Sequence, residues 1–391
     1  MLAACWLSVL PLHAFKTKMV VDNPTDYELP HQPYVVPLEQ LSGLAPEEQG
    51  QLAVYVEGRQ VSSQMDDLDR DGRPDELVFE VSLKPHERKT VVIKTVRPGR
   101  RRHFPALVYA DLIYKPDKQS RLYVQEMSTC EDTLYNWMHH HGMAFESELM
   151  GYRVYFDRKQ TVDLYGKRVP RLELKESGWY PTDEQLARGF GDDILRVSGS
   201  VGLGSVKPWN GQKALHLTSV GRRTQRILSQ GNVRTVCEIE VNDWQTEGKR
   251  VDMRVRYILY AHHRDCVVEI RASHDLDSLV TGVQKVNQGR EGLLRQQGLV
   301  GCWGTDWPVN DTVKYAKETV GLGVACYDKD VVRNVEDRQN NLLLLRYKAG
   351  SVLRFYITCV SMKEQGNPID SADKFFAYLR RWRQMVTADA Y

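Results

Sequence analysis

The 391-residue sequence lacks any apolar run long enough to cross a membrane, and it has almost no net charge. A membrane-spanning helix needs roughly 18 or more consecutive apolar residues, and no stretch reaches that length. The formal net charge is only +2, so no overall field draws the chain to nucleic acid or to an anionic membrane surface. We therefore expect neither a membrane span nor a nucleic-acid partner.

Closely spaced cysteine pairs are also missing. All cysteines except Cys5 lie beyond residue 100, and no two of them form a CxxC pair. This spacing argues against a structural zinc site. Cys237 and Cys359 lie in apolar, strand-like stretches, where cysteine behaves as a small buried hydrophobe. A single disulfide bridge is the alternative, and its pairing cannot be deduced from the spacing.

Nucleotide-binding loops and internal repeats are absent as well. The glycine-rich segment Ser198–Val206 reads SGSVGLGSV, which does not match GxGxxG and precedes no long helical pattern. We interpret it as a close-packed turn. No repeat of about 20–50 residues is visible, which argues against a propeller or a solenoid.

An apolar segment at the start of the sequence predicts export. Leu2–Leu12 is followed by Ala14 and then by Lys16 and Lys18, an arrangement typical of the apolar part and cleavage end of a secretory signal. We expect residues 1–14 to be the signal peptide and the mature protein to be periplasmic or extracellular. A lipoprotein box at Leu2–Cys5 is the second interpretation.

The remainder predicts an all-β protein. Strand-like stretches follow one another with almost no helix between them, as in the hairpin Val251–Ala261 and Cys266–Ser273. Such an order favours antiparallel sheets. Residues Asp370–Met385 show apolar positions at helical spacing and predict a short closing helix. We expect a large antiparallel β-sandwich over residues 15–391, with residues 19–105 as an N-terminal sub-sandwich.

An acidic loop resembles a calcium site. Calcium prefers carboxylate oxygens on alternating residues, with a glycine that permits a sharp turn. Asp67, Asp69, Asp71 and Gly72 fit this pattern, but the glutamate of an EF-hand is missing. A polar hairpin turn is the alternative. We expect no required cofactor, and the ligands of a structural calcium ion would be Asp67, Asp69, Asp71, Asp75 and Glu76.

The segment 139–167 concentrates titratable side chains. We predict one strand from Met143 to Phe156, with Glu146, Glu148 and Tyr152 on one face and Arg153 and Tyr155 on the other. Histidine titrates near neutrality and suits proton transfer, while arginine offers a fork for a carboxylate. The candidate catalytic residues are His140, His141, Glu146, Glu148, Arg153 and Tyr155.

Aromatic residues in loops suggest a sugar-binding surface. Ligand clefts combine aromatic faces with a few polar groups. The loop around Trp303 and Trp307 is rich in glycine and proline, which favours it as cleft lining, although packing is the alternative for each tryptophan. The candidate substrate-binding residues are Tyr152, Trp179, Tyr180, Trp209, Trp303, Asp306 and Trp307.

Four segments resemble a known family. DELVF at 75–79, the run at 151–167, ESGWYPTDEQLARGFGDD at 176–193 and GSVGLG at 199–204 resemble domain-of-unknown-function family 4861, over nearly the whole mature chain. The resemblance implies a secreted protein of a polysaccharide-degrading bacterium. It also implies a sandwich like that of galactose mutarotase and uronate-containing substrates. The motifs define no chemistry, and a fold alone selects none.

Three functional hypotheses remain open. In the favoured one, a polysaccharide lyase, Arg153 neutralises a uronate carboxylate while a histidine or Tyr155 removes the C5 proton. In the second, a hydrolase or epimerase uses His140 or His141 with a glutamate as acid and base. The third is a carbohydrate-binding protein without catalysis. Clustered histidines and carboxylates favour an enzyme over a binding protein.

Overall fold

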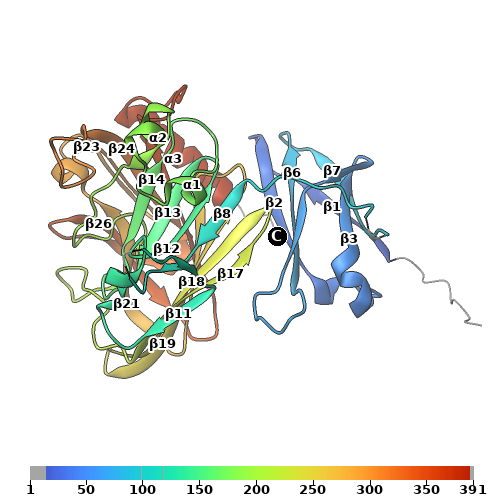
Figure 1. The fold of residues 1–391 in the computed structure, drawn as a ribbon, viewed down its shortest axis with the longest axis horizontal. Coiled ribbons are helices and arrows are strands. Elements are labelled where there is room, and N and C mark those ends of the chain that lie inside the picture. The colour runs from blue at the N-terminus through green and yellow to red at the C-terminus, as the bar shows by residue number, and fades with distance from the viewer. Residues whose placement is uncertain (1–14, 98, 118, 388–391) are drawn as a thin grey trace, which may run out of the picture. The chain divides into compact units, whose positions relative to one another are not determined.

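The computed structural model describes residues 15–97, 99–117 and 119–387. The signal peptide predicted over residues 1–14 lies outside them. The chain divides into two compact units, residues 1–104 and residues 105–391 (Figure 1). No helix in the described ranges is long and apolar enough to cross a membrane.

The N-terminal unit is built from two antiparallel sheets around one apolar core. Side chains such as Val54, Ile93, Leu77 and Phe79 are fully buried and pack in this core. Short 3-10 helices span Leu38–Gln40 (η1) and Pro46–Gln51 (η2). The four-stranded sheet has the order β1 (Lys16–Asp22), β7 (Arg88–Thr95), β3 (Leu52–Val56), β4 (Arg59–Val61), and the three-stranded sheet β2 (Leu29–Pro37), β6 (Glu76–Leu83), β5 (Ser63–Asp66).

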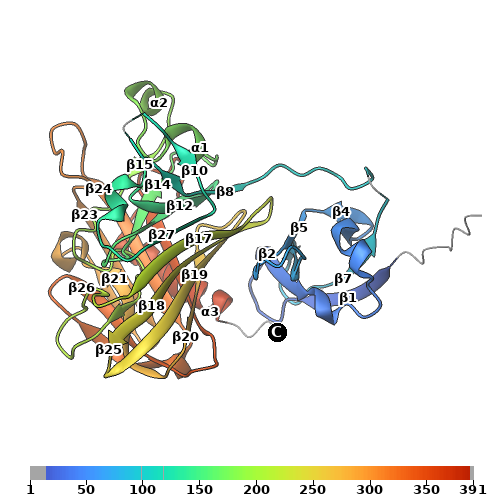
Figure 2. The same cartoon turned by 60° about the horizontal axis from the view of Figure 1, so that its bottom comes forward.

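A nine-stranded antiparallel sheet forms the main layer of the C-terminal unit (Figure 2). Two of its strands are 13 and 12 residues long, and several strands that follow one another in the sequence pair as hairpins. The order is β11 (Glu126–Thr129), β17 (Arg222–Gln230), β18 (Arg234–Thr246), β19 (Lys249–Tyr260), β20 (Cys266–Ala272), β27 (Leu353–Ser361), β24 (Glu318–Cys326), β23 (Leu299–Asp306), β22 (Leu293–Gln296).

Smaller sheets complete this unit. The five-stranded sheet has the order β15 (Asp192–Asp193), β14 (Val162–Gly166), β13 (Met150–Tyr155), β12 (Gly142–Ser147), β8 (Val108–Asp111). The four-stranded sheet has the order β16 (Lys207–Pro208), β21 (Leu276–Gln284), β26 (Asn340–Tyr347), β25 (Val331–Glu336), and a ribbon pairs β10 (Leu122–Tyr123) with β9 (Ile113–Tyr114). Helical segments are η3 (Leu134–Trp137), α1 (Leu174–Ser177), α2 (Asp183–Ala187), η4 (Val286–Gly289), η5 (Asp328–Asp330) and α3 (Ala372–Val386).

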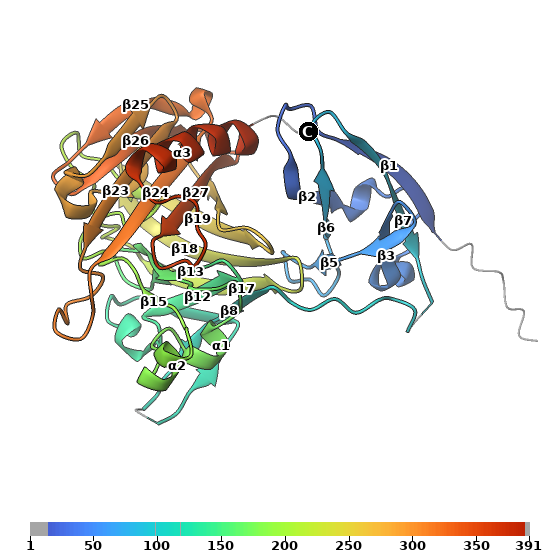
Figure 3. The same cartoon turned by 90° about the horizontal axis from the view of Figure 1, so that it is seen from above.

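One face of the nine-stranded sheet carries the core. Its inward residues, such as Ile239 and Tyr257, join apolar residues of the five-stranded and four-stranded sheets in one cluster. The rings of Phe145 and Tyr257 lie 5.9 Å apart across this interface. The predicted closing helix is confirmed as α3, which packs its Phe375 on the outer side of the same sheet (Figure 3). The predicted all-β, antiparallel character of the chain is confirmed, since every paired strand in the described ranges runs antiparallel.

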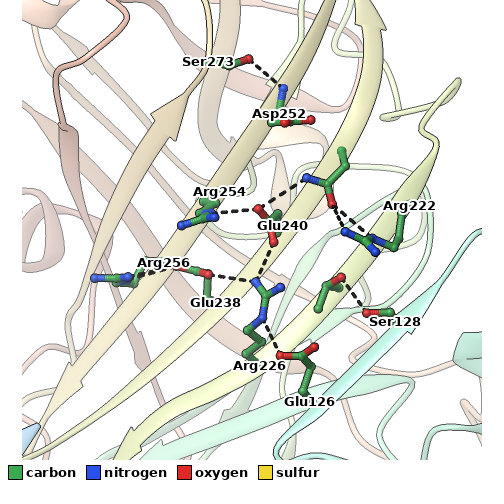
Figure 4. A network of polar contacts seen from close by, with 12 residues as sticks. Glu126, Ser128, Arg222, Arg226, Glu238, Glu240, Asp252, Arg254, Arg256 and Ser273 are labelled. Atoms are coloured by element: carbon green, nitrogen blue, oxygen red, sulfur yellow. Dashed lines mark hydrogen bonds and ion pairs between the residues drawn. The ribbon is translucent and has the colours of Figure 1, made fainter. Parts of the chain in front are cut away.

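The outer face over β17–β19 is polar instead. Arg226 contacts Glu126, Glu238 and Glu240 at 2.8, 3.2 and 2.7 Å (Figure 4). Arg254 and Arg256 extend this ladder to Glu240 and Glu238. Alternation along each strand therefore puts apolar side chains inside and paired charges outside, as antiparallel sheets do.

The described cysteines form no disulfide bridge. Cys130 is exposed, and the others, Cys237, Cys266, Cys302, Cys326 and Cys359, are buried. The interpretation of Cys237 and Cys359 as buried hydrophobes is confirmed, because both lie in the core cluster.

Candidate functional site

A tight hairpin sets the geometry of the site. The predicted single strand from Met143 to Phe156 is wrong, because the chain reverses after Ser147 into β12 and β13. Ala144 pairs with Arg153 and Glu146 with Gly151, so Glu146 shares its face with Arg153. Tyr152 points the other way, into the core, where its hydroxyl donates to the Arg264 carbonyl.

Arg153 is the centre of the polar face of the five-stranded sheet. Its guanidinium donates two hydrogen bonds to Asp163 Oδ2, from Nε at 3.1 Å and from Nη2 at 2.7 Å. It also donates to the hydroxyls of Tyr180 at 2.9 Å and Tyr155 at 3.0 Å, and it lies 4.6 Å from the Trp179 ring centroid. The Arg153 side chain is only 5% exposed. Four of its five N–H donors are bonded to protein groups and its charge is paired with Asp163, so it is poorly placed to bind a substrate carboxylate.

Asp193 is a second carboxylate beside the same guanidinium. It lies on the edge strand β15, with Oδ1 3.8 Å from Arg153 Nη2, and it accepts a hydrogen bond from the Trp179 indole. Burial, reinforced by the charge of Asp163 and opposed by Arg153, raises the pKa of Asp193 to about 7. The side chain remains 15% exposed. Asp193 can therefore both hold and release a proton near neutral pH.

Both carboxylates line a polar cleft of about 810 Å³. The lining combines more cationic than acidic side chains, together with amides and hydroxyls. Lys285 is paired with Glu336, and Lys159 lies 3.4 Å from Asp157. Arg196 and Arg338 are exposed and have no ion-pair partner in the part of the chain that the structure describes. The charged lining residues are Arg153, Lys159, Asp163, Asp193, Arg196, Lys285, Asp306 and Arg338.

The histidines lie beside this cleft and do not line it. His140 is fully buried, with Nε2 2.7 Å from Asp111 Oδ1, so substrate cannot reach it. The His141 ring stacks on Tyr155, with centroids 5.9 Å apart, and its Nδ1 lies 3.2 Å from the Tyr135 carbonyl. Burial, together with the charge of Arg153, lowers the pKa of His141. Its predicted catalytic role stays a prediction.

The predicted pairing of Glu146 with Glu148 on one strand face is wrong. Glu146 is completely buried, forms an ion pair with Lys167 and accepts the backbone N–H groups of Glu173 and Leu174. Glu148 lies in the turn after β12, with its carboxylate 3.1 Å from His262 Nδ1. Burial would raise the pKa of Glu148, but hydrogen bonds from His262 outweigh it and lower the pKa. Both glutamates therefore have structural partners.

The aromatic candidates separate into cleft and packing residues. Tyr180 is exposed beside Arg153, and Trp179 is buried beneath the guanidinium. Trp303 lies in β23, where it packs on Phe375 with ring centroids 5.7 Å apart, so its prediction as a loop residue is wrong. Trp209 packs on the cluster of Val201 and Val280. Of the last two candidates, Asp306 lines the cleft, and Trp307, half-buried, has its ring 5.7 Å from Lys317 Nζ.

Sequence reasoning missed the two aspartates of the site. Asp163 occupies a buried strand position between Val162 and Leu164, where an acid requires a partner. Asp193 follows Gly191, which approaches β14 so closely that a Cβ there would lie 1.7 Å from the Gly166 carbonyl oxygen. The carboxylate within an apolar strand was a signal in the sequence, whereas the close approach of Gly191 to β14 is seen only in the structure.

The acidic loop belongs to the N-terminal unit. The carboxylate oxygens of Asp67, Asp69 and Asp71 lie within 4.8 Å of one another. Asp75 Oδ2 instead accepts the backbone N–H of Leu68 at 2.5 Å and that of Asp69 at 3.2 Å. Glu76 starts strand β6. The structure thus brings together three of the five predicted ligands.

The fold and the cleft define a β-rich protein with an arginine–aspartate site. Residues 21–389 match the family described as Domain of unknown function (DUF4861), and the chain belongs to this family. No curated protein matches it.

Several solved structures are similar in part. One is a protein in the glycosyl hydrolase family 38 from Enterococcus faecalis, with 10% identity, a TM-score of 0.45 and coverage of 96% of this chain and 47% of that one. An alpha-mannosidase from Enterococcus faecalis V583 has 10% identity, a TM-score of 0.44 and coverage of 97% and 46%. A putative kojibiose phosphorylase from human microbiome has 13% identity, a TM-score of 0.36 and coverage of 62% and 33%. The chain thus spans slightly under half the length of the first two.

Proposed function

We propose that this protein is a carbohydrate-active enzyme that cleaves an acidic saccharide in the cleft, with Asp193 as its general acid. The observation that carries the proposal is Asp193 itself, a partly exposed cleft carboxyl beside Arg153 and Asp163 whose pKa is raised to about 7. Carboxyl pairs whose environments separate their pKa values are the usual acid–base machinery of sugar cleavage.

Hydrolysis is the reaction that this arrangement supports best. Asp193 donates its proton to the glycosidic oxygen as the bond to the anomeric carbon breaks. A water molecule attacks that carbon and gives its proton to Asp306, which lines the cleft from the end of β23. Arg153 and Asp163 are positioning residues, because their hydrogen bonds fix the charge next to Asp193.

The charge balance of the lining supports an acidic saccharide. Arg196 and Arg338 are the guanidinium groups of the cleft that have no acidic partner within the described ranges. A guanidinium binds a carboxylate or a sulfate through paired hydrogen bonds. These two residues therefore replace Arg153 as the proposed contacts of a substrate carboxylate.

β-Elimination is the second candidate, and the free guanidinium of Arg338 favours it. A lyase neutralises the uronate carboxylate with a cation, and Asp193 in its ionised form would remove the C5 proton. The C4–O bond then breaks as the C4=C5 double bond forms, and the departing oxygen takes a proton from water. Tyr155 is less suited as the base, because burial and the charge of Asp163 raise its pKa. The two reactions differ in product: elimination creates a C=C bond with ultraviolet absorbance, and hydrolysis creates only a new reducing end.

The test is a panel of acidic polysaccharides, starting with rhamnogalacturonan, assayed for reducing ends and for ultraviolet absorbance. We expect wild type to release reducing ends, and Asp193→Asn to lower kcat by about 100- to 10,000-fold. Asp373→Asn, on the exposed side of α3, is the matched control and should be unaffected. Turnover by Asp193→Asn at the wild-type rate, or binding of saccharides without turnover on every substrate, would overturn the proposal and favour a binding protein.

For the acidic loop we propose a structural calcium ion held by Asp67, Asp69 and Asp71. The convergence of their carboxylate oxygens supports it, since calcium takes oxygen ligands of this type. No catalytic role is assigned to it, because the cleft residues all belong to the other unit.

A further inference from the structure

A surface ribbon beside the cleft has an unusual composition. β9 lies between β10 and the segment 137–139: Tyr123 pairs with Ile113, the Lys115 N–H donates to the Trp137 carbonyl at 2.7 Å, and the His139 N–H donates to the Ile113 carbonyl at 2.9 Å. β9 and β10 therefore form a two-stranded ribbon, and the end of η3 with the turn that follows it is hydrogen-bonded along the other edge of β9.

The two faces of this ribbon differ. Tyr114 and Met138 pack into the main core. Alternation in β9 then directs Ile113 and Lys115 to the opposite face, together with Tyr123, which pairs with Ile113. Trp137, the last residue of η3, lies next to Lys115 through the hydrogen bond between their main chains. Ile113 is buried, whereas Trp137 is 51% and Tyr123 61% exposed. Large aromatic side chains this exposed are uncommon on a protein surface and mark a binding surface when they gather.

Cations lie among these rings. Arg121 directly precedes β10, and its Nη1 lies near His139: a Cβ on Gly178 would be 3.7 Å from that atom and 2.7 Å from His139 Nε2. Lys115 and Arg121 have no ion-pair partner among the residues that the structure describes.

Nearby acids are engaged elsewhere. Asp117 accepts hydrogen bonds from Ser120, Asp132 pairs with Arg223, and Glu126 pairs with Arg226. None of these three acids therefore forms an ion pair with Lys115 or Arg121.

Tyr180 joins this face to the cleft. Its ring lies 6.0 Å from that of His139, and its hydroxyl accepts a hydrogen bond from Arg153, which lines the cleft. The side chain is 45% exposed. We define the platform as Lys115, Arg121, Tyr123, Trp137 and Tyr180.

We propose that the platform is a second carbohydrate-binding site, which holds a length of acidic polysaccharide outside the cleft. Exposed rings can stack on the apolar faces of sugar rings, and the two cations can pair with carboxylates or sulfates of the same chain. The core of a protein–protein interface is depleted in charged residues, whereas the platform contains Lys115 and Arg121 among its aromatic rings. This composition favours a polysaccharide over a protein partner. The inference rests on the proposed function, because the ligand is the polymer that the cleft is proposed to cleave.

The test is affinity electrophoresis of the full chain in native gels that contain polygalacturonate, alginate or chondroitin sulfate, with galactan, xylan and mannan as neutral polymers. We expect at least one acidic polymer to retard wild type more than the neutral ones do. Tyr123→Ala/Trp137→Ala and Lys115→Ala/Arg121→Ala should each weaken that binding at least fivefold. Trp137→Phe should keep most of it, because a ring remains.

Arg271→Ala/Arg333→Ala removes the same charge as the lysine–arginine variant, from exposed positions on β20 and β25, and should bind as wild type does. Asp193→Asn should keep full retention while it loses turnover, so failure of the platform and failure of the catalytic proposal are distinguishable. The platform proposal is overturned if no acidic polymer retards wild type. It is equally overturned if the platform variants bind as tightly as wild type, or if the control pair loses binding to the same extent.

Discussion

At the scale of single residues, the placement of two aspartates around one guanidinium determines the proton affinity of the cleft. Asp163 takes the short contacts of Arg153 at 2.7 and 3.1 Å, and Asp193 is left with a contact of 3.8 Å. The weaker attraction does not offset burial, so the pKa of Asp193 stays raised. Chemically identical side chains thereby acquire different roles.

The pH dependence of turnover should report this arrangement. A general acid works only while protonated, so kcat/KM should fall as pH rises through about 7, the pKa of Asp193. The charge of Asp163 raises that pKa, so Asp163→Asn should move the falling limb to lower pH. Initial rates in constant ionic strength buffers give both profiles. If the falling limb of the pH profile lies at the same pH in Asp163→Asn and in wild type, the coupling of the two carboxyls is contradicted.

The free energy of unfolding should also depend on pH through the titration of Asp193, and the direction of that dependence is fixed. The pKa of Asp193 is raised from an ordinary value of 3.8 to about 7 in the folded chain. The stabilising effect of its proton is present at low pH and is lost as pH rises through this window. Asp193→Asn should therefore be more stable than wild type at pH 8, by on the order of 1 kcal/mol, with little difference at pH 4. Urea unfolding at the two pH values measures it. A variant less stable than wild type at pH 8 would refute the assignment.

Sequence patterns locate individual site residues better than they locate partners. Arg153, Tyr155 and Tyr180 can be selected by type and position, and the structure brings them into contact. Asp163 and Asp193 escape notice because their roles come from neighbours on other strands. Pairing across strands is set by register, and register is not visible in a single strand.

At the scale of elements, the hairpin of β12 and β13 shows where local patterns stop being informative. The alternation of side chains predicts strand correctly on both sides of Glu148 and Leu149. The turn at Glu148 and Leu149 contains no glycine, proline or asparagine, which are residues that mark turns in a sequence. Fold class was therefore predictable from strand content, whereas the face on which Glu146 lies was not.

The buried ion pair below this hairpin gives an energetic prediction. Glu146 is fully enclosed and offsets the charge of Lys167. Glu146→Gln leaves the ammonium buried without a counter-charge, so it should destabilise the fold by about 3–5 kcal/mol. Glu146→Gln/Lys167→Met removes both charges and should recover part of that loss. Urea unfolding of the two variants provides the comparison. Equal stability of Glu146→Gln and wild type would show that the pair contributes nothing.

At the scale of the whole molecule, the proposed calcium site and the proposed carbohydrate sites belong to different units. The cleft is built from residues 153–339, and the acidic loop lies within residues 1–104. Metal binding at the loop should therefore change stability without changing the chemistry of the cleft.

Calcium should raise the melting temperature of the protein at millimolar concentration. The expected shift is a few degrees, because an ion that binds only the folded loop stabilises it by mass action. Asp67→Asn/Asp71→Asn should abolish the shift, and magnesium should give less, because it demands stricter geometry. Differential scanning calorimetry measures each case. A melting temperature that calcium leaves unchanged removes the site, and a change in kcat would contradict the separation of the two units' roles.

Five enclosed thiols, at Cys237, Cys266, Cys302, Cys326 and Cys359, make the heat response of this protein depend on the redox state of its buffer. Unfolding exposes all five thiols together. Burial raises the pKa of these thiols in the folded chain and so keeps them unreactive, and this protection is lost on unfolding. A second calorimetric scan should reproduce the first only when a reductant is present. A sample scanned in air without reductant should form disulfide-linked dimers, which a non-reducing gel resolves. Alkylation of the exposed thiols after melting should prevent these dimers from forming.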